Sequence, residues 1–215
     1  MSFAVDPGAH LFWLGSRALG IVGLLLASAS VGLGLALSTR LGRLPGSAAR
    51  LKVVHEAAAL VSLAAIAGHG LLLLADPFLH PTVTQIAVPF QIGRDPFWTG
   101  LGIVAGWLAL LFTVSFYLRN TIGVRTWRRL HRWTILVFLL GLAHALGTGT
   151  DAGSTWLLAL IATAAIPVVM IGALRLGRLG RPRSSAGPRW PDRDRPRAAL
   201  GAAAGGGAAR STDPA

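Results

Sequence analysis

The chain has 215 residues, 53% of them hydrophobic and only 13% charged, with a mean hydropathy of +0.61. Soluble domains carry about 25% charged residues, so this composition excludes an ordinary soluble protein and predicts one embedded in a membrane. Cysteine is absent, which excludes disulfides, iron–sulfur clusters, thiolate metal ligands and a thiol nucleophile.

Five apolar segments approach or exceed the roughly 20 residues that a membrane span requires. In chain order they cover about residues 11–37, 53–74, 97–118, 130–146 and 155–174. The fourth segment is the shortest and needs the aromatic-rich stretch 127–133 to complete its span. The pattern therefore predicts an all-α integral membrane protein, a bundle of about five transmembrane helices.

Basic residues gather in three segments that five spans would place on one side of the membrane. They are Arg40, Arg43, Arg50 and Lys52 before the second span, Arg119, Arg125, Arg128, Arg129 and Arg132 before the fourth, and Arg175, Arg178, Arg181 and Arg183 after the fifth. Because cytoplasmic loops are enriched in Lys and Arg, we expect the N-terminus outside and the C-terminus in the cytoplasm. This placement of the +12 formal charge favours membrane lipid over nucleic acid as its partner.

The two ends of the chain have a different composition from its middle. Residues 1–10 form a short external N-terminus without the positive charge of a signal peptide, so the first span is not expected to be cleaved. Residues 176–215 are rich in Arg, Pro, Gly and Ala, which predicts a disordered basic cytoplasmic tail. The membrane domain is thus expected over residues 11–175.

Four of the six histidines lie in the second and fourth spans, which run in the same direction. His55 and His131 begin these spans next to the basic loops, and His69 and His144 lie near their outer ends. The four therefore group into an inner pair, His55 with His131, and an outer pair, His69 with His144. At 1.5 Å per residue, the stretch of helix from His55 to His69 separates the two levels by about 21 Å.

The helical positions of these histidines agree less well with one another. At about 100° per residue, His69 lies within roughly 40° of the His55 face, whereas His144 misses the His131 face by about 140°. A straight fourth helix would therefore point its two histidines in different directions. Either the two sites are rotated relative to each other, or a local distortion, for which Gly141 is a candidate, turns the helix.

Paired histidines on two spans, at positions i and i+14 on one and i and i+13 on the other, resemble the ferric reductase-like transmembrane domain. This family includes ferric-chelate reductases, NADPH oxidases and the haem subunit of bacterial methionine sulfoxide reductase. The resemblance covers about residues 10–175 and is carried best by the run TWRRLHRWTILVFLLGLAHALGTGTD around the fourth span. It implies that the inner and outer histidine pairs are axial ligands of two b haems.

Other polar residues within or near the spans have more than one interpretation. Arg17 lies inside the first span, where an unpaired charge is costly, and we expect it to bind the outer haem or its surroundings. Glu56 could be protonated, pair with an arginine or serve a proton or quinone site. His80 lies in the long outer connection 76–96, whose prolines suggest a structured cap over the outer haem, and could bind metal or shape an acceptor site. The glycines of spans one and three suggest close helix approach.

These observations predict transmembrane electron transfer in the cell membrane, from a cytoplasmic flavoprotein or membrane quinol to an external acceptor. The resemblance implies an oxidoreductase subunit, and the sequence shows neither a flavin nor an NAD(P) module, so the donor is expected to be a separate protein or a quinol. Two alternatives stay open. One is a haem-free transporter that uses the histidines as a proton relay, and the other is a sensor or assembly module that binds haem without turnover.

Overall fold

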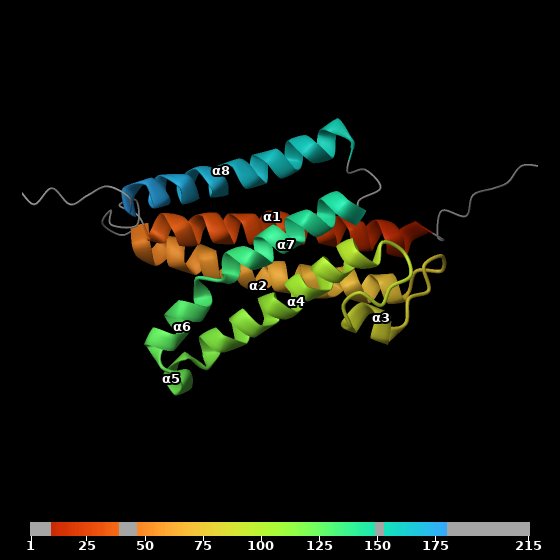
Figure 1. Ribbon diagram of the computed structural model, residues 1–215, viewed down its shortest axis with the longest axis horizontal. Helices are drawn as coiled ribbons and strands as arrows, with labels where there is room; N and C mark the ends of the chain where they lie inside the picture. The colour runs from red at the N-terminus through yellow and green to blue at the C-terminus, as the bar shows by residue number, and fades with distance from the viewer. Residues whose placement is uncertain (1–9, 39–46, 149–152, 180–215) are drawn as a thin grey trace, which may run out of the picture. The chain divides into compact units, whose positions relative to one another are not determined.

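The computed structural model describes residues 10–38, 47–148 and 153–179, and every regular element in these ranges is helical (Figure 1). A first compact unit covers Met1–Arg178 and a second covers Leu179–Ala215, so the predicted disordered tail lies almost wholly outside the described residues. The helices are α1 Leu11–Leu37, α2 Ser47–Leu74, α3 Val83–Ala87, α4 Pro96–Tyr117, α5 Arg119–Ile122, α6 Val124–His131, α7 Thr134–Thr148 and α8 Thr155–Leu179.

Five stretches of these helices are long and apolar enough to cross a membrane. They are Leu11–Leu37, Ala48–Leu74, Pro96–Tyr117, Val124–Thr148 and Thr155–Leu174. The prediction of an all-helical, multi-pass membrane protein is therefore confirmed. The second span begins several residues earlier than expected, because long basic side chains can remain at the end of a membrane helix with their charge in the interface. His55 consequently lies about two turns inside α2.

Four of the long helices form the part of the bundle that carries the histidines. The most extensive contacts are those of α1 with α2 and of α4 with α7, and smaller contacts join α1 to α7 and α2 to α4. Helix α8 meets α1 where the Ser28 hydroxyl donates a hydrogen bond to the carbonyl oxygen of Ala164. The bundle thus places α2 and α7, which carry the histidines, in contact with both α1 and α4.

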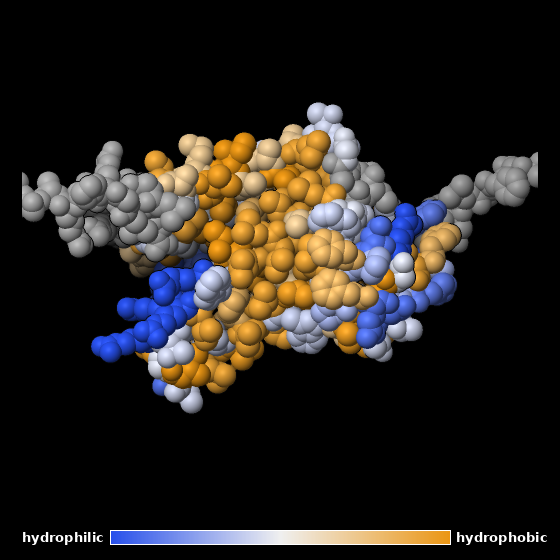
Figure 2. Space-filling view, in the orientation of Figure 1, coloured by the Kyte–Doolittle hydropathy of each residue, from blue (hydrophilic) through white to orange (hydrophobic). Residues whose placement is uncertain are grey.

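Small residues such as Ala65 and Ala105 and large ones such as Phe138 are buried between the helices, while many other large apolar side chains face outward. Figure 2 shows apolar residues across the middle of the visible face and hydrophilic ones towards the two ends of the helices. Each buried serine of the bundle donates a hydrogen bond to a backbone carbonyl, as hydrocarbon surroundings require. These serines are Ser16, Ser28, Ser30, Ser62 and Ser115.

The fourth span is interrupted between its two histidines. Helix α6 ends at His131, Arg132 and Trp133 form a turn, and α7 begins at Thr134. The angle expected between His131 and His144 in a straight helix therefore does not apply. The interruption does not occur at Gly141, which lies inside the continuous helix α7.

The connection between α2 and α4 is structured by hydrogen bonds. The Asp76 carboxylate accepts from the backbone amides of Phe78 and Leu79 at 2.7 and 3.1 Å. Thr82 and Gln85 form a capping box at the start of α3, in which each side chain satisfies the backbone amide of the other. The indole of α4 residue Trp107 donates to the carbonyl that ends α3 at 2.7 Å and so ties the two helices together. The expectation of a structured segment here is confirmed.

Candidate functional site

The structure brings the four membrane histidines together in two pairs. The rings of His55 and His131 have centroids 6.0 Å apart with an angle of 89° between their planes. Those of His69 and His144 are 6.1 Å apart with an angle of 72°. Both pairs join α2 to the interrupted fourth span, and their order along the two helices shows that α2 and α7 run in the same direction.

The spacing within each pair suits one metal ion between two imidazoles. A metal–imidazole bond is about 2 Å long and the ligating nitrogen lies about 1 Å from the ring centre, so rings on opposite sides of one ion have centroids roughly 6 Å apart. Among the described residues no group of three or more His, Cys, Asp or Glu could hold a metal ion. Two axial imidazoles alone suit a metal that brings its own in-plane ligands, as haem iron does.

An ordinary edge-to-face contact between two rings has a similar spacing, so the protonation of the rings gives a separate criterion. His55 Nδ1 lies 2.8 Å from the Ser30 carbonyl oxygen, and His69 Nδ1 lies 2.8 Å from that of Ser16. A carbonyl oxygen only accepts, so each Nδ1 carries the hydrogen and each Nε2 keeps its lone pair. This is the tautomer that metal-binding histidines adopt when they donate their second ring N–H to a backbone carbonyl.

The other ring of each pair is held by a different kind of contact. His144 Nδ1 lies 3.1 Å from the carbonyl oxygen of Trp98, at the start of α4. The His131 ring instead stacks on Trp127, one turn earlier in α6, with centroids 5.2 Å apart. Three of the four rings therefore donate to a carbonyl, and the fourth is positioned by an aromatic face.

Glycines allow the backbone of neighbouring helices to approach these rings closely. A Cβ atom added at Gly102 of α4 would lie 2.7 Å from the His144 ring. A Cβ atom at Gly20 would lie 3.0 Å from His69 Nδ1, and one at Gly34 would lie 3.3 Å from the His55 ring. Any larger residue at Gly102 would have to displace the imidazole. The expected close approach at the glycines of spans one and three thus occurs at the histidines.

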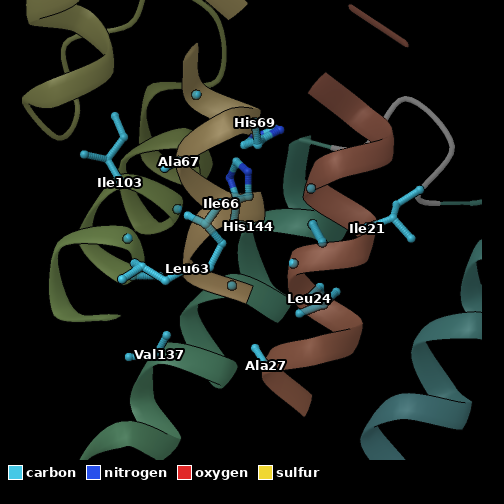
Figure 3. A pocket seen from close by; sticks show the side chains of 18 of the residues that line it. Ile21, Leu24, Ala27, Leu63, Ile66, Ala67, His69, Ile103, Val137 and His144 are labelled. Carbon is cyan, nitrogen blue, oxygen red and sulfur yellow. The ribbon is translucent and has the colours of Figure 1, made fainter. Parts of the chain in front are cut away.

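A cavity of about 780 Å³ surrounds the His69–His144 pair. Figure 3 shows the two rings near one another, His69 on α2 and His144 on α7, with apolar side chains of α1, α2, α4 and α7 around them. The volume lies within the range of natural cofactor sites. Apart from the two histidines, the polar side chains that line it are Arg17, Gln85, Thr99 and Thr148.

Arg17 lies half-buried on α1 and lines the cavity that surrounds His69 and His144. Its guanidinium carbon is 5.2 Å from the centre of the Trp13 ring and 5.8 Å from that of Trp156. These cation–π contacts connect the start of α1 to the start of α8. The cation is therefore held at the edge of the cavity by two aromatic rings.

Comparison with family models, curated proteins and solved structures finds no match to this chain. The resemblance to the ferric reductase-like domain consequently rests on the histidine spacing and on the sequence around the fourth span.

Three further residues, Glu56, His80 and His10, do not line the cavity. Glu56 is half-buried, and within the described ranges no ion pair or hydrogen bond involves its carboxylate. His80 is exposed, with a positive φ of 38°. His10 stacks on Phe78, with centroids 5.0 Å apart.

Two functional candidates, Ser16 and Ser30, were missed by the sequence analysis. Both are buried, and each contacts one histidine of α2. Their separation along the chain equals that of His55 and His69, and this equality was the available signal. Serines are common in membrane helices as ordinary interhelical contacts, so only the match of spacings singles out these two.

Proposed function

We propose that this chain transfers electrons across the cell membrane by holding two b haems, one between His55 and His131 and one between His69 and His144. The observation that carries the proposal is the ring spacing in each pair, which suits two ligands of one metal ion, together with Nδ1 hydrogen bonds at three of the four rings that leave Nε2 available as a ligand. The resemblance to the ferric reductase-like family supports the same assignment.

In this proposal the protein binds the two haems, orients the histidines that hold them and shields them from water. Residues on α1, α4 and α6 fix the histidine rings. Apolar side chains of α1, α2, α4 and α7 keep water away from the His69–His144 pair. Bis-histidine haem iron supplies one-electron redox chemistry and leaves no open position for a small ligand. About 21 Å of helix separates the two levels, so the pairs would carry charge across much of the membrane thickness.

The charge distribution supports an orientation with the His55–His131 pair on the cytoplasmic side. Basic residues are exposed near this pair, and cations in such positions can neutralise haem propionates or attract an acidic donor protein. These residues are Arg50, Lys52, Arg128 and Arg132. The opposite level is covered by the α2–α4 connection, whose Gln85 and Ile92 line the cavity. In this orientation the external acceptor would approach that connection.

Haem content tests the proposal directly. The wild-type protein, purified from haem-replete cells, should show a reduced-minus-oxidised b-type spectrum with two haems per chain. Variants of the four membrane histidines should each lose one haem, while His10→Ala and His80→Ala serve as matched controls that keep both. The four variants are His55→Ala, His69→Ala, His131→Ala and His144→Ala. A colourless wild type, or four variants with full haem content, would overturn the proposal and favour the proton relay.

Reduction distinguishes electron transfer from haem binding without turnover. The haem-loaded protein should be reduced by a quinol or by a reduced flavoprotein, and a transferring chain should then pass electrons to an acceptor enclosed in vesicles. Stable haem that neither donor class reduces would instead support the sensor or assembly module.

A further inference from the structure

Helix α1 carries none of the paired histidines, yet it contacts one histidine of each pair. Ser16 and Ser30 are separated along α1 by the same number of positions that separates His55 and His69 along α2. Because the two helices pack along each other in opposite directions, Ser16 meets His69 and Ser30 meets His55. The same contact is thus made twice, at two levels of the bundle.

The two contacts agree in their hydrogen bonds. At the first, Ser16 Oγ donates to the His69 carbonyl oxygen at 2.8 Å and lies 3.0 Å from His69 Nδ1. At the second, Ser30 Oγ donates to the His55 carbonyl oxygen at 3.2 Å and lies 3.1 Å from His55 Nδ1. Because each hydroxyl donates its hydrogen to the histidine carbonyl, its oxygen can only accept from the histidine Nδ1–H. That Nδ1–H therefore has two acceptors on the same serine, the hydroxyl oxygen and the backbone carbonyl oxygen.

A glycine lies one helical turn after each serine and faces the same imidazole. Gly20 approaches the His69 ring and Gly34 approaches the His55 ring. Residues at positions i and i+4 lie on one face of a helix, so Ser-x-x-x-Gly forms a single surface that accepts one imidazole. The other buried serine of α1, Ser28, instead bonds to a carbonyl of α8.

We propose that α1 is a duplicated positioning element, in which the hydroxyls of Ser16 and Ser30 each give the Nδ1–H of one haem-ligating histidine a second acceptor, beside the backbone carbonyl of the same serine, and so increase the basicity of the imidazole. This inference rests on the proposed function. An N–H that donates to oxygen makes the imidazole a stronger electron donor to its metal. A stronger donor stabilises the oxidised metal, so each serine lowers the reduction potential of its own centre.

The test is the midpoint potential of each centre in haem-loaded full-length protein, measured by optical redox titration and assigned with His69→Ala and His55→Ala. Ser16→Ala should make reduction of the His69–His144 centre up to about tenfold more favourable, which for one electron is a rise of about 59 mV. Ser30→Ala should do the same at the His55–His131 centre only. The unaffected centre in each variant reports that the bundle is folded.

Controls separate positioning from general packing. Ser28→Ala removes a buried serine of the same helix and should leave both potentials unchanged, and Ser30→Thr, which keeps the hydroxyl, should retain the wild-type value. Potentials that remain at wild-type values in both alanine variants, or that change equally at both centres, would overturn the positioning role. A wild type without haem would refute the proposed function itself, a result distinct from either of these.

Discussion

The His69–His144 pair and the His55–His131 pair share one ring spacing but differ in how their second ring is held. In both, the α2 histidine is fixed by a serine and a glycine of α1. The partner His144 lies inside α7 and donates to a carbonyl of α4, whereas His131 is the last residue of α6 and stacks on Trp127. One ring of each pair thus has a common support, and the other depends on local context.

This difference indicates that the His55–His131 pair is the less constrained of the two. A hydrogen bond restrains both the direction and the protonation of an imidazole, whereas a stacking contact restrains only the plane of the ring. His131 also precedes the turn at Arg132 and Trp133, where the helix is interrupted. The largest differences between the two centres should therefore originate at the fourth span and not at α2.

Removal of a ligand should have the largest effect and should be local. His144→Ala is expected to abolish the His69–His144 centre and to leave the other centre spectrally intact, because the two levels are about 21 Å apart. His131→Ala should do the reverse. The number of haems per chain and the number of transitions in an optical redox titration measure these outcomes. Loss of both haems in either variant would contradict independent centres.

Adding a methyl group beside His144 should be the next largest change. Gly102→Ala places a Cβ atom 2.7 Å from the His144 ring, and such overpacking costs about 1–3 kcal/mol. We expect reduced haem content at the His69–His144 centre and a lower thermal midpoint in detergent. Gly106→Ala, on the same helix with its nearest contact at 3.6 Å, is the matched control, and an equal loss there would refute the ring contact.

Removing the stacking contact between Trp127 and His131 should have a moderate effect on haem retention at the His55–His131 centre and none at the other centre. Aromatic pairs contribute about 0.5–1.5 kcal/mol beyond their buried area, so Trp127→Ala should speed haem loss from the His55–His131 centre roughly twofold to tenfold. Trp127→Phe keeps an aromatic face and removes an indole N–H that has no hydrogen-bond partner among the described residues. It should therefore retain haem like the wild type. Competition with apomyoglobin measures the rates, and equal acceleration at both centres would exclude a local role.

The smallest effect should be equal at the two centres. Ser62 lies midway along α2 between His55 and His69, and its hydroxyl donates to the Gly23 carbonyl at 2.8 Å. Interhelical hydrogen bonds in membranes are worth about 0.6 kcal/mol, so Ser62→Ala should lower the thermal midpoint slightly without altering either potential. A change confined to one potential would show that the packing of α1 on α2 is not shared evenly.

The sequence predicted the spans more closely than the connections between them. The first span agrees with the structure residue for residue, and the fifth has the same limits. Long apolar runs between basic loops are strong signals, because the membrane itself selects helices of that length. The start of α2 was less well predicted, because basic side chains at a membrane surface can belong to a helix or to a loop.

The grouping of the histidines by depth also followed from the sequence, since depth depends only on topology and helical rise. Their orientation did not. The mismatch of about 140° between His131 and His144 was calculated for a straight helix, and the structure has a turn at Arg132 and Trp133. No glycine or proline marks that turn, so no local signal pointed to it.

The sequence by itself determined that this is a helical membrane protein with histidines at two matched levels, because hydrophobicity and helical rise act locally along the chain. Only the tertiary structure decided that the rings lie about 6 Å apart, that three of them donate to carbonyls, and that α1 contacts both pairs. Those properties depend on which residues of neighbouring helices meet, and the pattern of apolar residues along one helix does not specify its neighbour.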